Sequence, residues 1–177
     1  MVKQRKAKGL ILRKARAKDN DQILVVFTKN LGKIFLIAKG ARKITSKRIG
    51  ALNTLNVIKF NYTGKNQQHY LKEVELISSL QSLKKDYEKR KAVIILAEIL
   101  DKLLPLNQKE EEIYAQTKII LRTINQNPFL KENMLDSTQK LLVLLGYLKP
   151  EQKLKSWSEL IEQIHNISER EFQSNKL

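Results

Sequence analysis

Five short runs of β-branched and aromatic residues, each bounded by charged or turn-forming residues, restrict the folds open to the first part of this chain. The predicted strands span residues 8–14, 23–28, 33–38, 52–63 and 69–76. Apolar runs of this length between turn signals are typical of strands. Five short strands packed this closely along the sequence predict a small closed barrel of the OB type.

After residue 80, the apolar residues recur at the spacing of a helix. Predicted helices cover residues 83–104, 110–124 and 134–148, a fourth begins at Ser156 in a capping-box pattern with Glu159, and a short final helix begins at Ser168. Pro105 ends the first of them. The sequence therefore predicts an α+β protein, with an N-terminal five-stranded OB-type barrel (residues 1–80) followed by an all-helical domain (residues 81–177).

The positive charge of the chain is concentrated in the predicted barrel. Residues 1–82 contain 18 Lys and Arg against 4 Asp and Glu, a net charge of +14, whereas residues 83–177 contain 16 against 14, a net charge of +2. A generally basic protein would spread its excess charge evenly. The asymmetry therefore favours a polyanionic partner such as nucleic acid.

The densest basic segment follows the third predicted strand, where residues 39–48 contain no acidic residue. We expect this loop to bind phosphates, with Gly40 allowing close approach of the backbone. Basic residues near the first and third strands would extend the surface. The predicted nucleic-acid-binding residues, which the resemblance described below implies bind DNA, are Arg13, Lys14, Arg16, Lys33, Lys39, Arg42, Lys43, Lys47 and Arg48.

Aromatic rings beside such a surface are candidates for base stacking. Phe27 and Phe60 are interpreted as barrel core, whereas Tyr62 and Tyr70, which flank a turn, are the stacking candidates. For both tyrosines the alternative of a core position stays open. Alternation in the fourth run places Val57, Lys59 and Asn61 on one face and Ile58, Phe60 and Tyr62 on the other.

The residues that usually carry catalysis are scarce. The chain has no Cys and 2 His, and the first 72 residues contain only Asp19 and Asp21 as acids, both in a predicted turn. Glu110, Glu111 and Glu112 are consecutive, so they would not share one helix face as metal ligands would. We therefore expect no catalytic residue, metal or cofactor, and no enzymatic activity. A metal-dependent nuclease is the enzymatic alternative.

Several motifs together resemble the RecO family of bacterial recombination mediators and DNA repair proteins. The resemblance extends over residues 5–150. The motifs that carry it are Gly9-Leu10-Ile11-Leu12, Asp19-Asn20-Asp21, Phe27-Thr28, Leu31-Gly32-Lys33, Ala38-Lys39-Gly40-Ala41-Arg42, Leu100-Asp101-Lys102-Leu103-Leu104-Pro105 and Leu144-Leu145-Gly146-Tyr147-Leu148-Lys149-Pro150.

This resemblance implies an N-terminal OB fold, a helical domain and non-enzymatic work on DNA. Members of the family bind single- and double-stranded DNA and anneal complementary strands. With RecR they help RecA replace the single-strand-binding protein, SSB, on gapped DNA. The C-terminal tail of SSB docks on their helical domain. Such a protein would be cytoplasmic and associated with the bacterial nucleoid.

One departure from the family concerns zinc. Many members carry four cysteines after the segment that matches residues 144–150, whereas this chain has none. The resemblance is therefore to a short form without the zinc finger.

The alternative function is that of an RNA-binding, ribosome-associated OB module, because charge and fold suit RNA equally well. No segment reaches the roughly 20 apolar residues of a membrane span, so we expect a soluble protein without a membrane partner.

Overall fold

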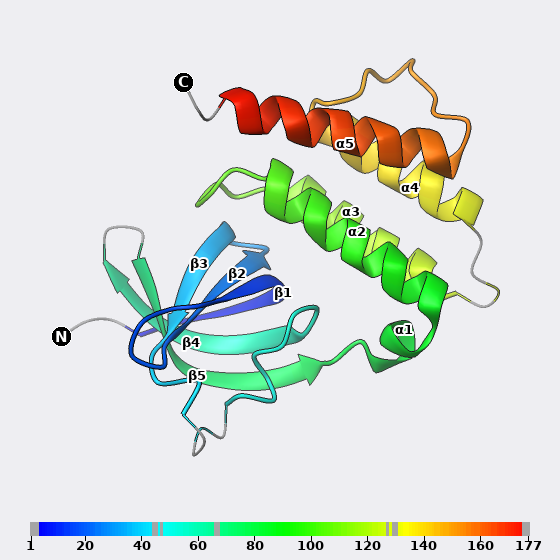
Figure 1. The fold of residues 1–177 in the computed structure, drawn as a ribbon. Coiled ribbons are helices and arrows are strands. Elements are labelled where there is room, and N and C mark those ends of the chain that lie inside the picture. Colours follow the sequence, from blue (N-terminus) through cyan, green and yellow to red (C-terminus); the bar gives the residue numbers. More distant parts are fainter. Residues whose placement is uncertain are drawn as a thin grey trace. The chain divides into compact units, whose positions relative to one another are not determined.

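The computed structural model describes residues 4–43, 46, 48–65, 68–126, 128 and 131–174, and Figure 1 shows its fold. The chain divides into two compact units. The first comprises Met1–Lys84 with Pro105–Glu111, and the second comprises Lys85–Leu104 with Glu112–Leu177. The segment Pro105–Glu111 thus groups with the strands, although the predicted division at residue 80 places it with the helices.

The first unit contains a closed five-stranded barrel (Figure 1), which confirms the predicted fold class. Its strands are β1 (Arg5–Arg16), β2 (Gln22–Thr28), β3 (Gly32–Ala38), β4 (Val57–Lys65) and β5 (Gln68–Ser78). Their order around the barrel is β1-β2-β3-β5-β4, and β4 pairs back onto β1. Only the β3–β5 pair is parallel, as in a five-stranded OB barrel.

Alternate residues of the strands fill the interior of the barrel. The buried core contains Ile11, Leu24, Val26, Ile34, Leu36, Ile58, Phe60, Tyr62 and Leu71. Strand β2 is buried on its other face as well, because Val25 and Phe27 are 2% and 0% exposed. Burial on both faces explains why β2 reads as a continuous apolar run rather than as an alternating strand.

The connection between β3 and β4 adds to the same core. Ala41 and Leu52 from this connection are fully or almost fully buried among the interior side chains of the barrel. Leu55 has a positive φ of +67°, and its N–H donates to the carbonyl oxygen of Ile11 at 2.8 Å. The prediction that the fourth strand begins at residue 52 is therefore wrong, since residues 52–56 form turns and β4 begins at Val57.

In the described part of the chain, five helices follow the barrel in sequence. They are α1 (Gln81–Lys85), α2 (Tyr87–Leu103), α3 (Glu111–Ile124), α4 (Lys131–Leu144) and α5 (Trp157–Ser174). Asp86 separates α1 from α2, because its side chain accepts a hydrogen bond from the N–H of Lys89 at 3.0 Å and caps α2. The single helix predicted for residues 83–104 is thus wrong at its start.

The helix start predicted at Ser156 is confirmed, because α5 begins at Trp157 and the N–H of Glu159 donates to Ser156 Oγ at 3.2 Å. The capping box is not complete, since the Glu159 carboxylate accepts from the N–H of Lys155 and not from that of Ser156. The separate short helix predicted at Ser168 is wrong, since α5 continues through this position. Within the second unit α5 packs against α4 and α2. Among the described residues, no helix is both long enough and apolar enough to cross a membrane.

Candidate nucleic-acid interface

The register of the barrel brings two loops to the same end of the sheet. Arg16 pairs with Gln22 across β1 and β2, and Gln22 pairs with Ala38 across β2 and β3. The β1–β2 turn (residues 17–21) and the 39–48 loop both leave the barrel from this row. Basic residues that are distant in sequence are therefore neighbours in the fold.

Backbone hydrogen bonds join these two loops. The N–H of Gly40 donates to Asp21 Oδ1 at 2.7 Å, and the N–H of Arg42 donates to the carbonyl oxygen of Asn20 at 3.0 Å. The Arg42 side chain donates from Nη1 to the carbonyl oxygen of Ala17 at 3.1 Å. The N–H of Gly40 is thus already bonded inside the protein, so the predicted role of Gly40 in approaching a phosphate is not supported.

The structure places most of the predicted basic residues at this end of the barrel. Arg13, Lys14, Arg16, Lys39 and Lys43 are exposed, whereas Arg42 and Arg48 are half-buried. Lys47 lies outside the described residues. Sequence analysis omitted Lys18 from the predicted site, although this exposed residue lies in the same turn as Asp21. We call the following set the basic end: Arg13, Lys14, Arg16, Lys18, Lys39, Arg42, Lys43 and Arg48.

Three of these cations also donate hydrogen bonds to other groups of the protein. Lys14 Nζ donates to Asn53 Oδ1 at 2.8 Å, and Arg48 Nη2 donates to the carbonyl oxygen of Lys39 at 2.7 Å. Together with Arg42, these residues use one donor each inside the protein. A guanidinium has five N–H donors, so each arginine retains others for an incoming phosphate.

The prediction that Lys33 extends this surface is wrong. Lys33 lies near the first residue of β3, whereas the 39–48 loop follows the last residue of that strand. The Lys33 side chain is only 7% exposed. Its carbonyl oxygen accepts a hydrogen bond from the N–H of Asn107 at 2.8 Å, so the segment Pro105–Glu111 runs beside it.

The two tyrosines proposed for stacking have different environments. Tyr62 is 3% exposed, and its ring packs against Phe60 at 5.8 Å and edge-on against His69 at 5.2 Å between ring centroids. Tyr62 is thus a core residue, and the prediction of base stacking is wrong for it. Tyr70 is half-buried beside the basic end, where Lys39 Nζ lies 5.3 Å from its ring centroid.

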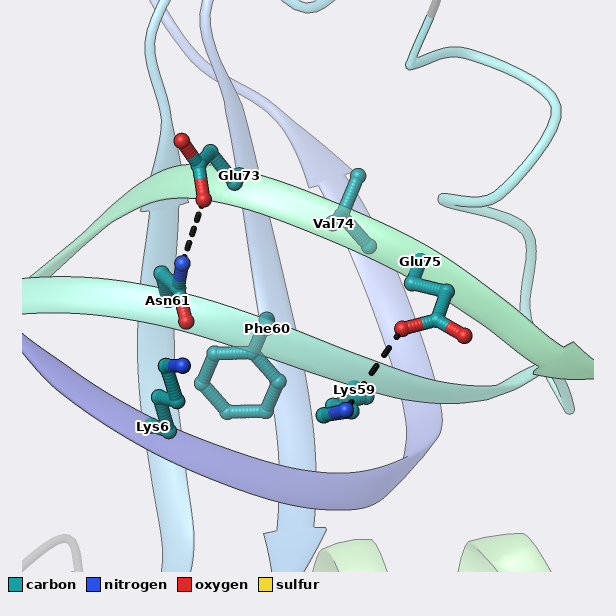
Figure 2. Close-up of a pocket in the computed structure, with 7 residues that line it drawn as sticks. All are labelled: Lys6, Lys59, Phe60, Asn61, Glu73, Val74 and Glu75. Carbon is teal, nitrogen blue, oxygen red and sulfur yellow. Dashed lines mark hydrogen bonds and ion pairs between the residues drawn. The ribbon is translucent and has the colours of Figure 1, made fainter.

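The barrel face formed by β1, β4 and β5 has a different charge pattern. Figure 2 shows a pocket of about 310 Å³ on this face, lined by Lys6, Lys59, Phe60, Asn61, Glu73, Val74 and Glu75. Lys59 Nζ lies 3.8 Å from a carboxylate oxygen of Glu75, and Asn61 donates a hydrogen bond to Glu73. Among the side chains that line this pocket, the two lysines are matched by two glutamates, so the charge of the pocket lining is balanced.

The pKa of His69, on β5, is shifted from its ordinary value. Burial lowers the pKa of His69, a hydrogen bond with the Asn107 side chain raises it, and the charge of Arg5 lowers it again, with a net lowering.

Within the described ranges, no group of three or more His, Asp or Glu side chains is arranged to hold a metal ion. The distinctive feature of this unit is therefore its basic end.

Comparison with known proteins shows what the barrel is similar to. Residues 1–80 match the family model described as Recombination protein O N terminal. A DNA repair protein RecO from Thermoanaerobacter sp. (strain X514) is 29% identical over 144 residues, which are 81% of this chain and 58% of the relative. A DNA repair protein RecO from Listeria monocytogenes serotype 4b (strain CLIP80459) is 28% identical over 121 residues, 68% of this chain and 48% of the relative.

The fold and these matches agree on the class of the barrel: it is an OB-type barrel, and its residues match the N-terminal part of recombination protein O. Over 68–81% of its length the chain is similar to proteins named DNA repair protein RecO. Its matched region spans 58% of the length of the Thermoanaerobacter relative and 48% of the Listeria relative.

Proposed function

We propose that this protein is a non-enzymatic DNA-binding protein of DNA repair and recombination, and that its basic end binds single- and double-stranded DNA. The observation that carries the proposal is the meeting of cations from β1, the β1–β2 turn and the 39–48 loop at one end of the barrel. The names of the relatives, DNA repair protein RecO, support the biological role.

The chemistry of the basic end favours binding without strong sequence preference. Lys and Arg contacts to phosphates position a nucleic acid but do not read its bases. A surface that neutralises two strands at once also lowers their mutual repulsion. On this basis the protein binds either strand form and accelerates annealing of complementary strands.

Tyr70 would add selectivity for unpaired bases. Its ring lies beside the basic end, and Lys39 covers one face at cation–π distance. When a strand binds, Lys39 moves to a phosphate and a base takes its place on the ring. Stacking of this kind is tolerant of sequence and requires a single strand, because duplex bases are already stacked.

The partners follow from the family resemblance. With RecR, the protein helps load RecA onto gapped DNA that is covered by SSB, and the C-terminal tail of SSB docks on the helical domain. These partner roles belong to the whole protein, and the matched region covers 58% of the first relative. Annealing of SSB-coated strands tests this part separately from DNA binding.

A salt series on a fluorescent oligothymidylate tests the DNA-binding proposal. If all eight cations engage phosphates, log K falls against log salt with a slope of about −5.6, at about 0.7 per contact. Replacing the exposed Arg16 and Lys43, as Arg16→Gln with Lys43→Gln, should reduce this slope by about 1.4. The matched control is Lys6→Gln with Lys59→Gln, which removes the same charge from the face with balanced charge.

The two pairs of substitutions separate a local site from general charge. A smaller slope for the Arg16 and Lys43 pair, with a wild-type slope for the control pair, supports the basic end. Equal losses for both pairs would mean that only net charge matters, and this result contradicts the proposed site. Tighter binding to structured RNA than to the oligothymidylate would favour the RNA-binding alternative.

A further inference from the structure

An acidic residue lies in the middle of the basic end. Asp21 belongs to the β1–β2 turn, and its carboxylate accepts a hydrogen bond from the N–H of Gly40 at 2.7 Å. A negative charge here should repel a DNA phosphate and weaken binding. The carboxylate should therefore lower the affinity for DNA, unless it also has a structural role that raises this affinity.

Asp21 instead fixes the geometry of residues 39–43. Its bond to Gly40 crosses from one loop to the other, at a residue with a φ of +62°. Two further hydrogen bonds join the same two loops. The Arg42 N–H donates to the carbonyl oxygen of Asn20, and the Arg42 side chain donates to the carbonyl oxygen of Ala17. The carboxylate is the only charged acceptor among these three bonds, and charged acceptors form the stronger hydrogen bonds.

The turn that carries Asp21 is itself well defined. The N–H of Asp21 donates to the carbonyl oxygen of Lys18 at 2.9 Å, and the carbonyl oxygen of Asp21 accepts from the N–H of Ala17 at 3.1 Å. Asp19 and Asn20 both take positive φ values, +55° and +63°, which Asp and Asn adopt more readily than most residues. The turn thus gives the carboxylate a firm base from which to hold Gly40.

We propose that Asp21 is a positioning residue that holds residues 39–43 in their DNA-binding conformation, an inference that rests on the proposed function. A loop already ordered in the free protein loses less conformational entropy when DNA binds. Asp21 therefore strengthens DNA binding through Gly40, although its own charge opposes the ligand.

Two substitutions at this position separate geometry from charge. Asp21→Asn removes the charge but keeps an Oδ1 acceptor for the Gly40 N–H, whereas Asp21→Ala removes both. We expect Asp21→Ala to weaken oligothymidylate binding roughly tenfold, about the worth of one hydrogen bond to a charged group. We expect Asp21→Asn to bind at least as tightly as the wild type. If charge alone mattered, both variants would bind more tightly.

Loop order is measured without DNA. Hydrogen exchange of the Gly40 amide should be slow in the wild type and in Asp21→Asn, and fast in Asp21→Ala. Trypsin should cleave after Lys39, Arg42 or Lys43 faster in Asp21→Ala than in the wild type. If Asp21→Ala does not fold, Asp21→Asn still decides, because rapid Gly40 exchange or weakened binding in that variant would overturn the proposal.

The failures of the two proposals are distinguishable. A wild type that does not bind the oligothymidylate at any salt concentration overturns the proposed function, and the role of Asp21 in binding with it. A wild type that binds, together with an Asp21→Ala variant of equal or higher affinity, overturns the positioning role alone. Weaker binding by Asp21→Ala with retained binding by Asp21→Asn supports both.

Discussion

The Asn56 side chain joins the 39–56 connection to the rest of the barrel unit, so its removal should destabilise that unit. Asn56 is 2% exposed. Its Nδ2 donates to the carbonyl oxygens of Gly50 at 3.2 Å and Ala51 at 3.0 Å, and its Oδ1 accepts from Lys84 Nζ at 3.0 Å. Asn56→Ala leaves these partners without their bonds while the backbone bonds of residue 56 persist.

The expected loss follows from these three bonds. Each bond to a carbonyl oxygen contributes about 1 kcal/mol, and the bond from the Lys84 ammonium contributes about 1.5 kcal/mol when fully buried. Lys84 is only half-buried and Gly50 is exposed, so water replaces part of the lost bonding. We therefore expect Asn56→Ala to lower the free energy of unfolding of the barrel by about 2–3 kcal/mol.

Hydrogen exchange of the barrel strands measures this change, since β1 and β4 amides report opening of that unit without interference from the helices. The matched control is Asn53→Ala. Asn53 also donates to the Gly50 carbonyl oxygen, at 3.1 Å, but it is exposed, so its loss should cost no more than about 0.5 kcal/mol. Equal effects of the two substitutions would refute the argument that buried hydrogen bonds of Asn56 stabilise the barrel.

Three further outcomes are expected. Because the pKa of His69 is lowered in the folded state, stability should fall as pH decreases from about 6.5 to the folded-state pKa and then level off, and His69→Gln should remove this dependence in thermal melts. Gly32→Ala should destabilise the barrel by more than about 1 kcal/mol in the same exchange assay, because φ is +67° and a Cβ would lie 1.7 Å from the Gln108 carbonyl oxygen, whereas Gly50→Ala, which meets no atom within 4 Å, should be tolerated. Tyr70→Leu should weaken oligothymidylate binding by about 1–3 kcal/mol and leave duplex binding unchanged, with Tyr70→Phe close to wild type; equal losses on both DNA forms would contradict stacking.

Local periodicity explains why the barrel could be predicted from the sequence. Ile58 and Phe60 alternate with polar residues, and the structure buries both in the core as this pattern requires. The same alternation assigns Tyr62 to the buried face. The stacking prediction gave more weight to the nearby turn than to the period of two, and the structure shows that the period decided the position of the ring.

Contacts between distant segments explain the errors at the site. Lys33 is one of many basic residues in the sequence, and its burial depends on the pairing of β3 with Leu106, more than seventy positions later. Gly40 was predicted to approach a phosphate, yet its N–H bonds to Asp21, 19 positions earlier. Neither contact has a periodic signal in the sequence, so neither could be inferred without the fold.

The order of residues in the 39–48 loop reflects two tasks performed by one segment. Ala41 is fully buried in the barrel core, and its neighbour Arg42 bonds to the β1–β2 turn. Burial of one small apolar residue thus fixes the backbone from which the flanking cations project, so the loop cannot leave the basic end without exposing part of the core. This coupling explains why reversing Arg42 would test both tasks at once, whereas the exposed Lys43 tests the charge alone. If DNA binds the folded barrel as proposed, the free energy of unfolding should rise with the logarithm of the free DNA concentration once that concentration exceeds Kd.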